Sequence, residues 1–183
     1  MNRTRKFAVA GITVAAVVGT LLILPQVFVE NVVISGQVES IPTEGLAKRA
    51  DLVIIGTVTD KRTETTESTK YPLVNIATIE VVEPLKNGAD SKTIEVRSFG
   101  TGEATINGIR YNVKVADGSS DLPTGKDMVL FLDYDEGNVL GDGYYVIGGY
   151  QGVFTIEDGM AENADSSRDL PMSELRTIIE ESS

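Results

Sequence analysis

The chain has 183 residues, of which 42% are hydrophobic and 23% are charged, enough for one domain with a substantial core and an appendage. Its formal net charge is −11, from 16 Lys and Arg against 27 Asp and Glu, and charge of this sign disfavours binding to nucleic acid. The absence of Cys and His excludes disulfides, zinc–thiolate sites, cysteine nucleophiles and histidine general bases.

The N-terminal segment has the features of an uncleaved membrane anchor. Residues 1–6 form a short basic tail, and residues 7–24 then run for 18 positions without a charge. As a helix this run spans about 27 Å, close to the roughly 30 Å hydrocarbon core of a bilayer. We predict one transmembrane signal anchor over residues 7–29, with the N-terminus in the cytoplasm and the domain outside it. Cleavage as a secretory signal, which would release the protein, is the alternative.

Residues 30–42 predict a stalk or a first edge strand. Thr43 is placed to cap a short helix that follows, since a threonine hydroxyl accepts hydrogen bonds from the free amides of a helix start. Two continuous apolar runs, residues 52–58 and 128–132, predict strands buried on both faces. Shorter runs predict further strands at residues 77–81, 94–97, 111–115, 144–147 and 153–156.

Two pairs of turn residues predict tight hairpins between short strands. They are Asn107-Gly108 and Asp158-Gly159. A two-residue hairpin loop requires positive φ at both positions, which Asn, Asp and Gly adopt more readily than other residues. These turns favour an antiparallel sheet, because a hairpin joins antiparallel neighbours.

The last part of the chain predicts a connector and a helix. Residues 161–168 are predicted to be solvated, and Asp169 or Ser173 is placed to cap a C-terminal helix with one apolar face. Together the elements predict a mainly β fold, a small antiparallel OB-like β-barrel over residues 43–160. A short lead-in helix opens this domain, and the connector and C-terminal helix occupy residues 161–183.

The motifs ADLVIIGTV at residues 50–58 and IEVVEPLKNG at residues 79–88, followed by the glycine-rich segment 143–159, resemble a group of uncharacterised exported bacterial and archaeal proteins. The domain of that group is similar to the OB-like barrel of tissue inhibitors of metalloproteinases and netrin modules. The resemblance covers residues 43–159 and implies a fold more than an activity. Those inhibitors bind zinc through an N-terminal Cys, and this chain has no Cys, so protease inhibition is not implied.

The densest acidic loop contains the predicted metal ligands Asp133, Asp135 and Asp142. Calcium prefers several oxygen ligands from one flexible loop, which these carboxylates would supply. The spacing is not that of an EF-hand, because Tyr144 stands where its bidentate Glu belongs. The alternative is a polar connection between two buried strands. We predict no cofactor other than this calcium ion.

The predicted partner-binding residues are Arg110, Asn112 and Lys114, the one local basic stripe after the apolar run. That part of the chain carries 13 basic and 27 acidic residues, a balance of −14, which argues against a nucleic-acid partner. Alternatively, the stripe only balances acids such as Glu103 across the hairpin.

No residue pattern in the sequence has a catalytic signature. We therefore predict a membrane-anchored, extracytoplasmic binding or structural module without enzymatic activity, whose partner is a protein or a cell-envelope component. A carboxylate- or metal-dependent extracytoplasmic hydrolase is one alternative, since 27 acids supply many carboxylate pairs. A calcium-dependent surface adhesion domain is another.

Overall fold

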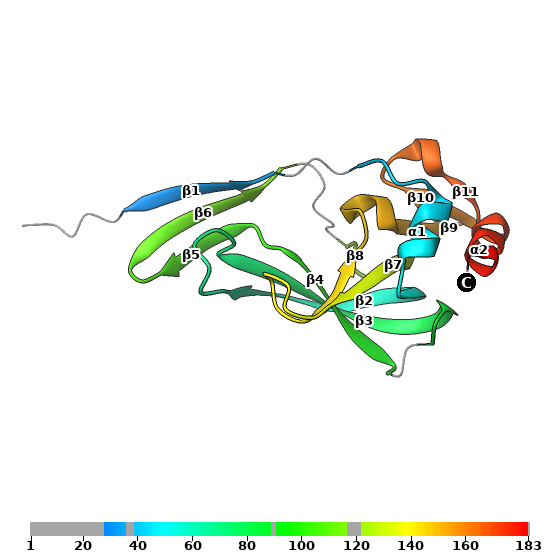
Figure 1. The fold of residues 1–183 in the computed structure, drawn as a ribbon, viewed down its shortest axis with the longest axis horizontal. Coiled ribbons are helices and arrows are strands. Elements are labelled where there is room, and N and C mark those ends of the chain that lie inside the picture. Colours follow the sequence, from blue (N-terminus) through cyan, green and yellow to red (C-terminus); the bar gives the residue numbers. More distant parts are fainter. Residues whose placement is uncertain (1–27, 36–38, 89–90, 117–121, 183) are drawn as a thin grey trace, which may run out of the picture.

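A computed structural model describes residues 28–35, 39–88, 91–116 and 122–182. Within these ranges the fold is mainly β, with eleven strands and two α-helices, which confirms the predicted class at this level (Figure 1). Only Phe28 and Val29 of the predicted anchor at residues 7–29 are described, and Val29 is the first residue of strand β1 and not part of a helix. The rest of the predicted anchor lies outside the described residues. No helix in the described ranges combines the length and apolar character needed to cross a bilayer.

One sheet contains eight of the strands, namely β2 (Leu52–Thr65), β3 (Leu73–Lys86), β4 (Thr93–Phe99), β7 (Asp127–Asp135), β8 (Gly143–Val146), β9 (Val153–Glu157), β10 (Met160–Asn163) and β11 (Leu170–Pro171). Their order across the sheet is β11-β10-β9-β7-β2-β3-β4-β8. Neighbours are antiparallel apart from β4 and β8, which are parallel. The predicted antiparallel pairing is therefore present through most of this sheet.

The sheet curls back on itself, because β8 also pairs with β7. Strand pairing thus runs in a ring through β2, β3, β4, β8 and β7. The contact between β4 and β8 is short, with Val96 paired to Tyr144 and Arg97 paired to Tyr145. The described strands do not form a clearly closed barrel, so they do not establish the predicted OB-like barrel.

The two continuous apolar runs are buried on both faces, as predicted. On one face, alternate residues of β2 and β7 join β3 and β4 in an apolar cluster that includes Leu52, Ile54, Ile79, Val96, Met128, Leu130 and Leu132. On the other face, the intervening residues pack under α1 (Thr43–Arg49) and α2 (Met172–Glu181), in a cluster that includes Leu46, Val53, Val129, Phe131, Phe154, Leu175 and Ile179. Burial on both faces explains why these runs do not alternate.

Both helices begin without the predicted side-chain caps. Pro42 and Pro171 occupy the positions before the first turn, and neither helix has a side-chain cap hydrogen bond. Thr43 is the first residue of α1, and Ser173 lies inside α2. Asp169 instead accepts a hydrogen bond from a backbone N–H of β10, at 2.9 Å. A proline at this position removes one unpaired amide of the helix start, but it has no side-chain oxygen to accept from the amides that follow.

The prediction of a solvated connector at residues 161–168 is wrong for its first part. Met160–Asn163 forms β10, which pairs with β9, and Ala161 is fully buried. A short 3-10 helix, η2 (Ser166–Arg168), follows. The predicted hairpin between β9 and β10 is confirmed, with φ of 50° at Asp158 and 80° at Gly159.

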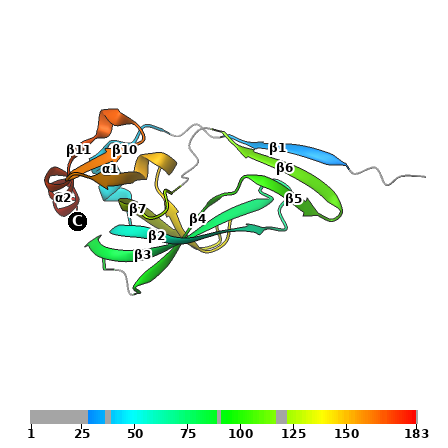
Figure 2. The ribbon, with the colours of Figure 1, turned by 180° about the vertical axis from the view of Figure 1, so that it is seen from behind.

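A second sheet of three strands, which we call the arm, consists of β1 (Val29–Ile34), β5 (Gly102–Ile106) and β6 (Ile109–Val115). The predicted hairpin joins β5 to β6, with φ of 50° at Asn107 and 81° at Gly108. β1 lies parallel to β6 at the edge of the arm, so the first part of the segment at residues 30–42 is an edge strand. Figures 1 and 2 show the arm at the end of the molecule opposite α1 and α2.

Candidate functional site

A pocket of about 250 Å³ lies on β2, β3 and β4, where the curled sheet opens. β7 pairs with β2 over Leu52–Thr57. After Thr57, β3 is the only described strand that pairs with β2. The back of the pocket contains Ala77, Val96 and Leu122, which also belong to the apolar cluster of the sheet. The pocket therefore continues outward from the core.

A row of polar side chains crosses the mouth of this pocket. Thr63 on β2 lies opposite Asn75 on β3, which lies opposite Ser98 on β4, so their side chains share a face. The Thr63 hydroxyl donates to Asn75 Oδ1 at 2.8 Å, and Asn75 Nδ2 donates to the Phe99 carbonyl at 3.5 Å. None of the described lining residues is a carboxylate. The lining thus offers hydrogen bonds and apolar contact rather than acid–base chemistry.

Among the described residues, no strand pairs with the outer edge of β2 after Val58, which has an isolated bridge to Thr124. Charged side chains lie on the face of β2 opposite Thr63, where Arg62 reaches Glu64 on β2 and Glu95 on β4. Arg62 Nε lies 2.8 Å from Glu64, and another guanidinium nitrogen lies 2.8 Å from Glu95. The hydrogen bonds to Glu64 and then to Glu95 raise the pKa of Arg62. Charged side chains commonly protect an edge strand from unspecific pairing with other chains. An edge protected in this way is available to a partner that matches its charges.

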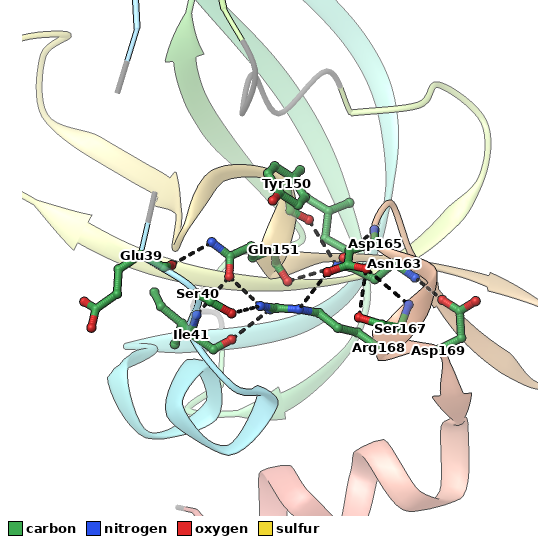
Figure 3. A network of polar contacts seen from close by, with 11 residues as sticks. Glu39, Ser40, Ile41, Tyr150, Gln151, Asn163, Asp165, Ser167, Arg168 and Asp169 are labelled. Carbon is green, nitrogen blue, oxygen red and sulfur yellow. Dashed lines mark hydrogen bonds and ion pairs between the residues drawn. The ribbon is translucent and has the colours of Figure 1, made fainter. Parts of the chain in front are cut away.

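A buried polar network joins the segment before α1 to η1 (Gly149–Gly152) and η2 (Figure 3). At its centre is Gln151, which is 1% exposed. Its Oε1 accepts hydrogen bonds from the Ile41 amide at 2.9 Å and from an Arg168 nitrogen at 2.6 Å, and its Nε2 donates to the Glu39 carbonyl at 2.9 Å. Arg168 also donates to the Ile41 carbonyl at 2.8 Å and to Ser40 Oγ at 3.0 Å.

Asn163 at the end of β10 completes the network. Its Nδ2 lies within hydrogen-bond distance of three carbonyls, those of Tyr150 at 3.1 Å, Gln151 at 3.0 Å and Val153 at 2.8 Å. Its Oδ1 accepts from the Asp165 amide at 3.0 Å. A buried network with all its polar atoms paired rigidifies and specifies the surrounding structure. We therefore interpret it as a clamp that fixes residues 39–41, where the chain enters the domain, and not as a reaction centre.

The predicted calcium ligands make separate local contacts. Asp135 Oδ2 accepts from Asn138 Nδ2 and Asp142 Oδ1 accepts from the Gly137 amide, both at 2.7 Å. Asp133 lies beside Asp51, and desolvation followed by the hydrogen bond and charge of that neighbour raises its pKa. In the described part of the chain, no three acidic residues gather in a group that could hold a metal ion. Calcium binding stays a prediction of the sequence.

The predicted partner-binding residues lie together on the arm. Arg110, Asn112 and Lys114 alternate along β6 and share its outward face. Asn112 Nδ2 donates to Asn31 Oδ1 at 3.3 Å. Glu103 lies directly opposite Asn112 on β5, and within the described ranges it forms no ion pair with either basic residue. The alternative in which Glu103 neutralises the stripe therefore has no direct contact to support it.

Sequence reasoning missed both the pocket and the clamp. Thr63, Asn75 and Ser98 come from three strands, and only the pairing register shows that they form one row. Gln151 and Asn163 are polar residues of irregular or short segments, where the sequence suggests exposure. The only local signal was the glycine-rich context of Gln151.

No protein-family model, curated protein or solved structure matches the chain. The resemblance to exported proteins with an OB-like barrel therefore stays a prediction. The hydrolase and adhesion alternatives stay predictions as well.

Proposed function

We propose that the chain is a membrane-anchored, extracytoplasmic binding module that holds an extended peptide segment of an envelope protein beside β2. The observation that carries this proposal is the open edge of β2 next to the polar-mouthed pocket. Both features meet at Lys61, Arg62 and Thr63. The tether is the sequence-based part of the proposal, from the apolar run and its basic tail.

An extended peptide would add to the edge of β2 as a further strand. Backbone hydrogen bonds provide affinity in this mode of recognition, and pockets for alternate side chains provide specificity. The row of Thr63, Asn75 and Ser98 would bond a polar group, and Val96 and Leu122 would contact an apolar one. The group of Arg62, Glu64 and Glu95 lies on the other face of these strands and would select peptides whose side chains on that face carry complementary charges.

The finer fold that we propose is an OB-like barrel. The five strands of the ring follow one another in space in the order β2, β3, β4, β8, β7, and β4 is parallel to β8. Numbered along the chain, this is the order 1-2-3-5-4, with the third and fifth strands parallel. This arrangement supports a five-stranded, partly open OB barrel. Such barrels bind ligands on their second and third strands, which by analogy are β3 and β4, two of the three strands that line the pocket.

The experiment uses the absence of Cys, which makes an introduced cysteine unique in the full chain. A photoreactive crosslinker is placed at Thr63→Cys beside the pocket. The matched control is Val82→Cys, which is also exposed and lies seven residues along β3 from Asn75. Crosslinking in intact cells, with the membranes then washed in alkaline carbonate, reports the partner and the tether separately.

We expect the protein to stay with the washed membranes and a defined adduct to form at Thr63→Cys only. Filling the pocket with Ser98→Trp should reduce that adduct. Release of the protein by carbonate would contradict the tether and favour the secreted form. The same adducts at both cysteines, or none at Thr63→Cys, would contradict binding at the edge of β2.

A further inference from the structure

The outward face of the arm combines apolar and basic side chains. In the parallel register of β1 and β6, Val29 lies opposite Arg110 and Val33 lies opposite Lys114, so all four side chains share this face. Val29 is 52% exposed and Val33 is 63% exposed. The other face of the arm packs inward through a cluster that includes Val32, Ile34, Tyr111 and Val113. The arm is therefore amphipathic, with an outward face that no described segment covers.

The charge of this face is opposite to that of the rest of the domain. Arg110 and Lys114 are exposed, and neither forms an ion pair within the described ranges. Glu103 is the one acid that the described strands of the arm place on this face. The chain after the apolar run has a balance of −14, so a net positive face is a local exception. Such a face is attracted to anionic surfaces, while the remainder of the domain is repelled by them.

The predicted anchor brings this face to a bilayer. The continuous apolar run ends at residue 24, before Pro25 and Gln26, and β1 begins at Val29. The four residues between them reach at most about 14 Å when fully extended. The headgroup layer on each side of the hydrocarbon core is about 5–8 Å thick, so β1 starts at or close to it. Phe28, which is 66% exposed, directly precedes β1 and suits the interfacial region.

We propose that the outward face of the arm lies on the anionic phospholipid surface of the membrane that contains the anchor. Arg110 and Lys114 contact headgroup phosphates, and Phe28, Val29 and Val33 enter the interfacial region. This inference rests on the tether in the proposed function. Because α1 and α2 lie at the opposite end of the molecule, contact through the arm would point them away from the bilayer (Figures 1 and 2).

The chain has no Trp, so a single introduced tryptophan reports its own distance from lipid. The full-length chain, with Val33→Trp or Thr105→Trp, is reconstituted into phosphatidylcholine–phosphatidylglycerol vesicles whose acyl chains carry bromine, which quenches nearby tryptophan. Thr105 on β5 is exposed and lies opposite Arg110. Because β6 separates β5 from β1, the tether alone does not bring Thr105 to the lipid surface. Val82→Trp, at an exposed position of β3, is the control.

We expect clear quenching at Val33→Trp and Thr105→Trp and little at Val82→Trp. Adding Arg110→Gln and Lys114→Gln to Thr105→Trp should reduce its quenching. Each basic residue near an anionic surface strengthens binding about 5-fold, so the pair shifts the bound-to-free ratio of the arm by about 25-fold. Phosphatidylcholine vesicles alone should reproduce the loss. Circular dichroism confirms that each variant is folded.

The outcomes separate the inference from the tether. If the protein floats with the vesicles but Thr105→Trp is quenched no more than Val82→Trp, the arm does not lie on the lipid, and its face is free for a protein. If quenching at Thr105→Trp is the same without anionic lipid or without the two basic residues, phosphate recognition is wrong. Failure of the full chain to float would contradict the tether itself.

Discussion

The clamp at Gln151 can be tested by replacing its amide with a side chain of similar length. Gln151→Met removes all three of its hydrogen bonds without leaving a large cavity. Two of the partners then lose a hydrogen-bond acceptor in the interior, although Arg168 keeps the Ile41 carbonyl and Ser40 Oγ. They are the amide of Ile41, a buried residue, and the guanidinium of Arg168, whose side chain is 12% exposed.

The expected loss follows from these unpaired groups. A buried amide without a partner costs about 1–3 kcal/mol, and a lost hydrogen bond to a charged group costs about 1.5–3 kcal/mol. The carbonyl of Glu39 belongs to an exposed residue and can be hydrated. We therefore expect Gln151→Met to lower the free energy of unfolding by about 3–5 kcal/mol, or the melting temperature by roughly 6–20 °C.

Gln151→Glu is the matched control, because it keeps the acceptor oxygen that faces Ile41 and Arg168. It turns a second carboxylate oxygen toward the Glu39 carbonyl and adds a buried charge that Arg168 partly neutralises, so its expected loss is about 1–3 kcal/mol, smaller than that of Gln151→Met. Urea and thermal unfolding of the full chain in detergent, followed by circular dichroism, measure both variants. Buried polar groups are sometimes replaced by apolar ones at no cost. A Gln151→Met protein as stable as the parent, or more stable, would refute the clamp.

Three further predictions concern stability. Gly152→Ala should lower the free energy of unfolding by about 2 kcal/mol, because the added Cβ would lie 2.5 Å from a backbone carbonyl oxygen. An unchanged midpoint of urea unfolding would contradict this prediction. Asp133→Asn should raise the melting temperature at neutral pH, since burial and Asp51 raise the pKa of Asp133 and its ionised form destabilises the fold as the pH rises. The increase in melting temperature should disappear below pH 3.8, the ordinary pKa of an Asp side chain, because both forms are then uncharged. An increase that persists below this pH would contradict the explanation. The two hydrogen bonds from Arg176 lower the pKa of Glu83. Arg176→Gln should therefore lower the free energy of unfolding by about 0.5 kcal/mol above pH 4.5 and leave it unchanged in strong acid, where Glu83 is protonated.

Local chemistry was enough to predict several elements from the sequence. Asn107-Gly108 and Asp158-Gly159 form the expected hairpins, because positive φ at both positions is a property of these residues themselves. The runs at residues 52–58 and 128–132 are buried strands, since an unbroken apolar run has no face that favours water. Composition likewise determined the absence of thiol and imidazole chemistry.

Local patterns were misleading where a distant partner supplied what the residue needed. Asp169 was predicted as a helix cap, but its carboxylate pairs with a strand amide, and a proline precedes the helix instead. Residues 161–168 have a polar composition, but Ala161 and Asn163 are buried, because β10 pairs with β9 and Asn163 finds three carbonyls inside. Burial of a polar group depends on such partners, which the sequence alone does not locate.

What the sequence by itself determined is the mainly β class, the hairpins, the two core strands, the acidic character and the apolar run that predicts an anchor. Only the tertiary structure decided that Thr63, Asn75 and Ser98 form one row, and that Val33 lies beside Lys114. The physical reason is register: side chains alternate with a period of two along a strand, so a shift of one residue would turn either set to the opposite face. Which residues lie opposite one another is fixed by packing across the whole sheet, and no single strand specifies it.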